Sequence, residues 1–117
     1  MDLRNFIPHP PQIQDKSRAY ELKERLDWGE PALTIVDARE RHAFQEGHIT
    51  GAIAMPPADL VARALETLEL ERDIYIYRDT DEETAIAAAE LRAVGYTHVS
   101  EIRGGLAAWK AFGYPIE

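Results

Sequence analysis

One stretch in the second half of the chain, residues 73–94, constrains the fold more than any other part of the sequence. It opens with an apolar, β-prone run at residues 74–77, which is typical of a central parallel strand buried on both faces. Polar residues interrupt this run, and apolar or small residues then return with helical spacing at Thr84, Ala87, Ala88, Leu91 and Val94. A buried strand followed, after a short polar segment, by a helix indicates the repeating unit of an α/β sheet.

The strand and its helix are separated by polar residues, which are Arg78, Asp79, Thr80, Asp81, Glu82 and Glu83. Thr80 and Glu83 fit a capping box, and Asp81 is a rival N-cap, so we expect the helix to begin within this loop. Open α/β sheets usually place their ligand site where a loop joins the carboxyl end of a strand to a helix N-terminus. The loop is therefore the candidate functional site.

Weaker patterns of the same kind flank this unit. Further strands are expected around residues 12–14, as an edge strand, and at residues 33–36, 52–54 and 98–102. Further helices are expected from an N-cap at Ser17 to Asp27 and at residues 39–45, 59–68 and 106–112. Strands that alternate with helices imply a parallel sheet with right-handed crossovers and helices on both faces. We interpret residues 1–11, with three prolines, as an extended arm before a single domain at residues 12–117.

Composition excludes several classes of function. The net charge of −8, with no Lys/Arg cluster, argues against binding nucleic acid or an anionic membrane surface. The chain has no Cys, which removes disulfides, thiolate zinc sites, iron–sulfur ligation and any thiol nucleophile. The histidines do not show the spacing of metal ligands, so we expect neither a metal site nor a cofactor. Without a signal peptide or a membrane span in the sequence, a cytoplasmic location is expected.

Three stretches resemble the sequence signatures of rhodanese-like domains. The first is VDARE at residues 36–40, followed by Phe44 and by GHITGA at residues 47–52. The second is LRAVGY at residues 91–96 with Val99, and the third is RGGLAAW at residues 103–109, followed by GYPI at residues 113–116. The resemblance covers roughly residues 12–117. It implies the family's three-layer α/β/α fold with a five-stranded parallel sheet.

The sequence departs from this family at its functional centre. Active members carry a nucleophilic Cys directly after the central strand, usually behind a Tyr, at the head of a six-residue loop. Tyr77 matches that Tyr, and Arg78 stands at the position of the Cys. Farther along the loop, Asp81 falls at a common Gly position, Glu83 at a common Arg position and Thr84 at a common Ser position.

These replacements should remove the family's chemistry. Sulfur transfer needs a thiolate that attacks the donor and carries a persulfide, whereas the guanidinium of Arg78 stays protonated and cannot be a nucleophile. The loop's carboxylates should also repel an anionic donor, because two like charges 4 Å apart repel by about 4 kcal/mol at an effective dielectric of 20. We therefore expect a catalytically inactive domain that acts as a protein-binding or regulatory module through this loop, with a basic protein as its partner. Its oligomeric state stays open.

Each candidate residue also has a purely structural interpretation. Arg78 either grips a carboxylate of a partner or forms a local ion pair with an acid of the loop or helix, and the local pair is favoured. The acidic loop is either a recognition patch or a set of acids that stabilises a helix start. Asp37, Arg39 and His48 are either an acid–base set or a structural network near the site, and the network is favoured. Trp109 and Phe112, spaced i, i+3, are expected in the core.

Two other functions compete with the binding module. The first is an enzyme, related to the sulfurtransferases or of another kind, that uses the same pocket without a Cys nucleophile. It would take His48 or a loop carboxylate as its general base. The second is a structural domain of a longer protein that only packs against a neighbour.

Overall fold

A computed structural model describes residues 13–29 and 32–117 of the chain. The extended arm predicted for residues 1–11 lies outside the described residues. The parallel sheet has the strands β1 (Lys16–Ser17), β2 (Leu33–Asp37), β3 (Ile53–Ala54), β4 (Asp73–Tyr77) and β5 (Val99–Ile102). The helices are α1 (Ala19–Asp27), α2 (Arg41–Glu46), α3 (Leu60–Thr67), α4 (Asp81–Ala93) and α5 (Gly105–Ala111).

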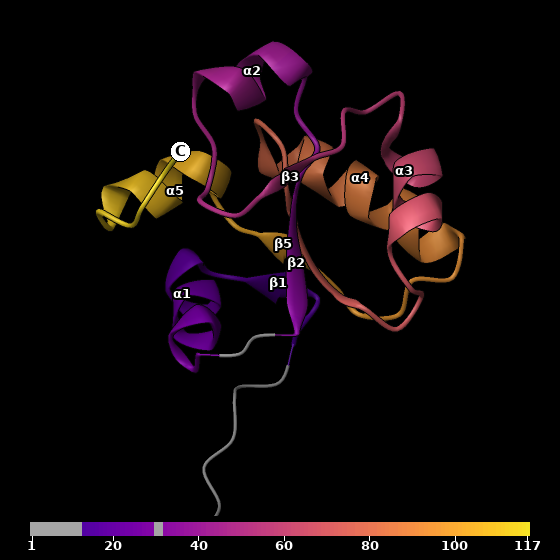
Figure 1. Cartoon of the computed structure of the whole chain (residues 1–117), viewed down its shortest axis with the longest axis horizontal. Coiled ribbons are helices and arrows are strands. Elements are labelled where there is room, and N and C mark those ends of the chain that lie inside the picture. The colour runs from indigo at the N-terminus through magenta and orange to yellow at the C-terminus, as the bar shows by residue number, and fades with distance from the viewer. Residues whose placement is uncertain (1–12, 30–31) are drawn as a thin grey trace, which may run out of the picture.

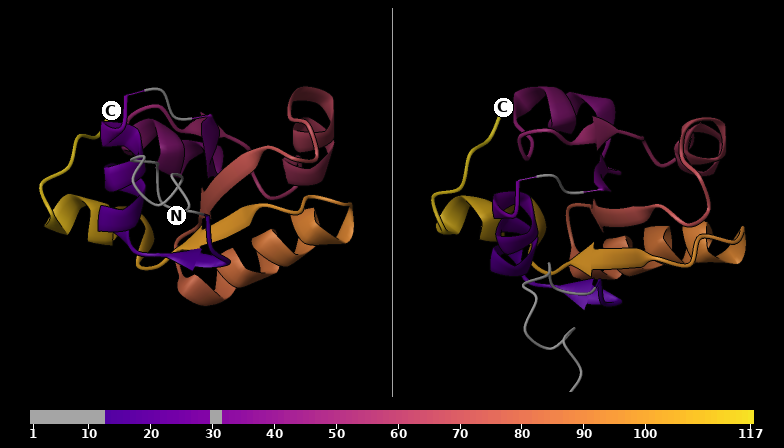
Figure 2. Two further views of the ribbon diagram at one scale, coloured as in Figure 1. Left: turned by 90° about the horizontal axis from the view of Figure 1, so that it is seen from below. Right: turned by 60° about the horizontal axis from the view of Figure 1, so that its bottom comes forward.

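The five strands lie in the order β1-β5-β4-β2-β3, and every pairing is parallel. Helices α3 and α4 lie on one face of the sheet, and α1 and α5 lie on the other (Figures 1 and 2). The α/β/α architecture and the five-stranded parallel sheet predicted from the sequence are confirmed. No helix in the described part of the chain is long and apolar enough to cross a membrane.

Strand β4 occupies the middle of the sheet because both of its faces are apolar. Its alternating residues enter two cores: Ile74 and Ile76 pack under α3 and α4, while Tyr75 and Tyr77 pack under α1 and α5. All four side chains are buried. This two-sided burial is the reason that the run is continuously apolar instead of alternating with polar residues.

Helix α4 lies on β4 through the stripe that the sequence predicted. Thr84, Ala87, Ala88 and Leu91 are buried, whereas Val94 is 38% exposed because it is already the C-cap. Two alanines on this face let the helix backbone approach the sheet closely. The backbone after Val94 turns with a positive φ of 110° at Gly95, a left-handed conformation that favours Gly, and the helix ends there.

The N-terminal edge differs from the prediction. The edge strand is formed by Lys16 and Ser17, not by residues 13 and 14 of the predicted strand, whose first residue lies outside the described residues. Helix α1 has Arg18 as its N-cap instead of Ser17. Ser17 does not cap the helix, because it lies in β1 and its hydroxyl is hydrogen-bonded to the hydroxyl of Ser100, across the β1–β5 pair. The backbone N–H of Arg18 donates to the carboxylate of Glu21 at 2.8 Å and helps to fix the helix start.

The prediction for the final helix is half right. Trp109 is buried, and its indole N–H donates to the carbonyl of Pro115 at 2.7 Å. Phe112 was expected in the core, but it is 55% exposed. It is the C-cap of α5, where the helix face has turned toward solvent, and its ring stacks on that of Tyr114 with 5.3 Å between the ring centres.

Candidate functional site

The acidic loop lies at the carboxyl end of β4, in the middle of the sheet. Strand β4 ends at Tyr77 and α4 begins at Asp81, so the connecting segment is only residues 78–80. The carboxylates of Asp81, Glu82 and Glu83 therefore stand in the first turn of the helix, where negative charge interacts favourably with the helix dipole.

Arg78 is held by its own loop. Its guanidinium Nη2 lies 3.5 Å from Oε2 of Glu83, while its Nε is buried and has no hydrogen-bond partner among the described residues. Its backbone N–H donates to the hydroxyl of Thr84 at 2.8 Å, and that hydroxyl donates to the carbonyl of Thr80 at 2.9 Å. The favoured alternative, a local ion pair, is the arrangement that the structure contains, and the partner is Glu83.

Thr80 caps α4. Its hydroxyl oxygen accepts the N–H of Glu83 at 3.1 Å and its hydroxyl donates to Oε1 of Glu83, also at 3.1 Å. The cap predicted from the Thr80–Glu83 spacing is thus confirmed. In a standard capping box the Glu carboxylate would accept the backbone N–H of the cap residue instead.

Asp81 is not the N-cap. Its carboxylate accepts the backbone N–H of Gly104 at 2.9 Å and lies 3.8 Å from Nε of Arg103. These contacts tie the start of α4 to the turn before α5. That turn packs closely on the loop, because a Cβ added to Gly105 would lie 3.0 Å from the carbonyl oxygen of Arg78. Gly105 also has a positive φ of 49°, so the position favours Gly for two reasons.

Two carboxylates of the loop remain unengaged. Asp79 and Glu82 are exposed, and neither takes part in an ion pair between side chains of the described residues. They are therefore the loop acids most available to another molecule.

A buried polar network lies beneath the loop. The carboxylate of Asp37, fully buried, accepts the hydroxyl of Tyr77 at 2.7 Å and an Nη2–H of Arg39 at 2.7 Å. The Arg39 backbone N–H and Nε–H also donate to this carboxylate. In turn, the hydroxyl oxygen of Tyr77 accepts the N–H of Ile49 at 3.1 Å. This network joins the ends of β2 and β4 to the segment that precedes β3.

His48 lies apart from this network. Its Nδ1 is 2.8 Å from the carbonyl of Phe44, its Nε2 is 3.1 Å from a carboxylate oxygen of Glu117, and its ring stacks on that of Phe44. The structure therefore joins Asp37 to Arg39 directly and attaches His48 to α2 and to the C-terminal segment. The three residues do not form an acid–base set. No group of three or more metal-ligating side chains is found within residues 13–29 and 32–117.

The buried hydroxyl of Tyr77 makes the stability of the fold depend on pH in the alkaline range. Burial and the hydrogen bond to the Asp37 carboxylate raise the pKa of Tyr77 above its ordinary value. In the unfolded chain the phenol ionises near pH 10, whereas in the folded chain it stays neutral, so its contribution to stability is complete below about pH 10 and is lost as the pH rises toward the folded-state pKa. We expect the free energy of unfolding to fall by up to about 1.4 kcal/mol per pH unit there from this group alone.

Urea titrations between pH 9 and pH 11, on the chain and on Tyr77→Phe, test this expectation. The Tyr77→Phe variant should lose stability less steeply than the parent as the pH rises, whereas Tyr20→Phe, at an exposed position, should keep the parent's slope. Equal slopes in the parent and in Tyr77→Phe would contradict the assignment.

Comparison with known proteins shows which family the chain is related to. The family model for the rhodanese-like domain matches residues 18–112. This chain belongs to the rhodanese-like domain family. The recognition made from the three sequence signatures is thereby confirmed.

Solved structures and curated relatives agree with this assignment. A crystal structure of the Alr3790 protein from Anabaena sp. is 57% identical, covers 86% of this chain and 90% of that chain, and superposes with a TM-score of 0.84. A sulfurtransferase from Allochromatium vinosum is 33% identical over 95 residues, 81% of this chain and 87% of that protein. An HTH-type transcriptional regulator from Mycobacterium tuberculosis is 33% identical over 105 residues, which are 89% of this chain but only 45% of the regulator.

Arg78, which the resemblance places at the family's nucleophile position, is the first residue after β4. The sequence did not indicate the contacts of Asp81 with Gly104 or of Tyr77 with Asp37. The first joins residues 23 positions apart and the second joins residues 40 positions apart. One feature of the sequence points to the second contact: Tyr77 ends a buried strand, and a buried hydroxyl needs a hydrogen-bond partner.

Proposed function

We propose that this rhodanese-like domain lacks sulfurtransferase activity and works as a protein-binding or regulatory module. The observation that supports this proposal best is Arg78 at the nucleophile position, in a chain that contains no Cys. A protonated guanidinium paired with Glu83 offers no lone pair with which to attack a sulfane sulfur.

The environment of Arg78 is also poorly suited to an anionic donor. A persulfide and its donor anion need backbone N–H groups that point into the loop. Here the N–H groups of Arg78 and Glu83 already donate to the hydroxyls of Thr84 and Thr80. The N–H of the nearby Gly104 donates to Asp81. The loop's own side chains thus occupy these donors and add negative charge.

A binding role agrees with the rigid framework around the loop. Asp79 and Glu82 are exposed at the start of α4, whose N-terminus is capped by Thr80 and whose inner face is buried. These two acids therefore stand on a fixed element and are available to contact another molecule. Fixed carboxylates favour a basic partner and increase its rate of association. A regulatory role also agrees with the relative named as a transcriptional regulator. In that longer protein the stretch similar to this chain makes up 45% of the length.

Charge reversal on the loop tests the binding role. Asp79→Lys/Glu82→Lys leaves the cap at Thr80 and the Asp81–Gly104 contact intact, so the fold should be unchanged. We expect this variant to lose a basic partner captured from the source lysate, with affinity reduced by about tenfold or more in low salt.

Glu24→Lys/Glu66→Lys is the matched control, since both acids are exposed and lie outside the loop. It has the same net charge as the loop variant and should retain the partner. If the loop variant and the control retain the same partner equally well, the loop is not the contact.

A further inference from the structure

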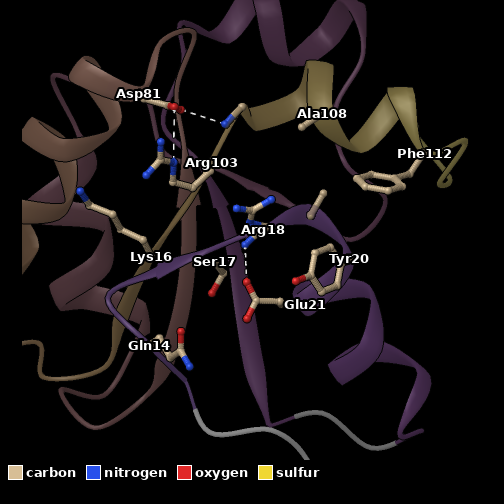
Figure 3. A pocket seen from close by; sticks show the side chains of 12 residues that line it. Gln14, Lys16, Ser17, Arg18, Tyr20, Glu21, Asp81, Arg103, Ala108 and Phe112 are labelled. Carbon is tan, nitrogen blue, oxygen red and sulfur yellow. Dashed lines mark hydrogen bonds and ion pairs between the residues drawn. The ribbon is translucent and has the colours of Figure 1, made fainter.

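A cleft of about 630 Å³ opens beside the start of α4. Its walls are contributed by β1, the first turn of α1, the Arg103–Gly104 turn and α5, and α4 contributes only Asp81. Arg78 does not line it. The cleft, drawn in Figure 3, is therefore a feature of the β1 edge of the sheet, and its lining does not include the residue at the family's nucleophile position.

The charge of the cleft is opposite to that of the chain as a whole. Its cations are Lys16, Arg18 and Arg103. Its two carboxylates are already engaged, because Glu21 accepts the backbone N–H of Arg18 at 2.8 Å and Asp81 accepts that of Gly104 at 2.9 Å. Within the described residues, neither Lys16 nor Arg18 takes part in an ion pair between side chains. A chain with a net charge of −8 thus has a local site that attracts anions.

The other end of the cleft is aromatic. Tyr20 and Phe112 are 46% and 55% exposed, and their rings meet edge to face with 6.4 Å between the ring centres. In Figure 3 these two rings stand on one side of the cleft, Lys16 and Arg103 stand on the other, and Arg18 lies between them. A ligand that fits both ends carries negative charge at one end and an aromatic or large apolar group at the other.

The cleft is also lined by β1, which is an edge strand of the sheet among the described residues. Glu101 and Arg103 donate their backbone N–H groups to the carbonyls of Asp15 and Ser17, at 2.9 Å and 2.8 Å. In a parallel ladder the residue between two such partners directs its own N–H and C=O to the opposite side, so those of Lys16 point away from β5, to the side on which no other described strand lies. An extended peptide can pair with this edge while its side chains reach the cations and the rings.

We propose that this cleft binds an extended, acidic peptide segment of a partner protein that carries an aromatic side chain. This inference goes beyond the proposed function, which concerns Asp79 and Glu82 and a partner of the opposite charge. A peptide fits better than a small molecule, because small-molecule sites are mostly apolar and enclose their ligand. Here, by contrast, Lys16, Arg18 and Arg103 are exposed to solvent.

Fluorescence anisotropy with a labelled probe peptide tests the inference on the full chain. The probe has one Trp flanked on both sides by Asp residues, and its companions have Ala in place of Trp or Lys in place of Asp. We expect the acidic Trp peptide to bind, the Ala peptide to bind at least about fivefold more weakly, and the Lys peptide not to bind at this cleft. Binding should weaken as salt is raised from about 20 mM to about 300 mM.

Substitutions in the cleft test whether the probe peptide binds there. Arg18→Glu and Tyr20→Ser should each weaken binding by about fivefold or more, while Arg63→Glu, an exposed charge reversal on α3, should change it by less than about twofold. Asp79→Lys/Glu82→Lys should leave probe binding in place, so the failure of this inference and that of the proposed function can be told apart. The inference is overturned if no acidic peptide binds, if Arg18→Glu binds as well as Arg63→Glu, or if inorganic phosphate displaces the probe at constant ionic strength.

Discussion

Replacing Asp37 with Ala is expected to lower the free energy of unfolding by about 3–5 kcal/mol, because it removes one partner from a buried ion pair and leaves the other charge uncompensated. Arg39 is only 8% exposed, and its Nη2 lies 2.7 Å from Asp37. The same substitution takes away the acceptor of the Tyr77 hydroxyl. A domain of this size has only about 5–15 kcal/mol of stability in total, so the variant should be close to unfolding.

Urea unfolding followed by circular dichroism measures this change. Asp79→Ala is the control, since the exposed Asp79 should contribute less than about 1 kcal/mol. Asp37→Asn keeps the shape of the side chain and removes its charge, so it should fall between the parent and Asp37→Ala. A loss below about 1 kcal/mol in Asp37→Ala would show that the network is not a structural support.

The second large effect concerns the nucleophile position. Arg78→Cys restores the family's residue type, but it also removes the cation that pairs with Glu83, whose side chain is 40% exposed. The Glu83 carboxylate then lies unpaired near a developing thiolate and an incoming thiosulfate, and the other acids of the loop add to the negative charge. Two like charges 4 Å apart repel by about 4 kcal/mol at an effective dielectric of 20, before screening. We expect thiosulfate–cyanide turnover by this single variant to remain close to the uncatalysed rate.

Changing the acids together with the nucleophile should restore turnover. In Arg78→Cys/Asp81→Gly/Glu83→Arg, two carboxylates are replaced, one by Gly and the other by a cation. We expect this triple variant to exceed Arg78→Cys by about 100-fold, which corresponds to about 2.7 kcal/mol of barrier. The same triple background with Ser at position 78 is the inactive control. Robust turnover by Arg78→Cys alone would show that the acids matter less than the geometry implies.

The central unit of the fold was predictable because its signals are local and strong. Residues 74–77 are apolar throughout because β4 is covered on both faces, and the small residues of α4 repeat at the helical period on one buried side. Thr80 was identified as the cap because capping depends on residues only three positions apart. Local chemistry was sufficient to predict these features.

Features that depend on distant partners were predicted less well. Ser17 has the side chain of an N-cap, but the neighbouring Ser100 on β5 engages its hydroxyl. Asp81 has a position that suits an N-cap, but its carboxylate accepts the backbone N–H of Gly104 instead. Phe112 follows the helical period of Trp109, but the helix ends there and leaves it exposed. In each case a tertiary contact or a helix end determined the outcome, and neither is visible in local spacing.

The most direct test of the account is a sulfurtransferase assay on the purified chain. Thiosulfate and cyanide are supplied, thiocyanate is measured, and the heat-denatured protein serves as the blank. With Arg78 at the nucleophile position and no thiol in the chain, thiocyanate should form no faster than in the blank. Formation above the blank that scales with protein concentration would contradict the account.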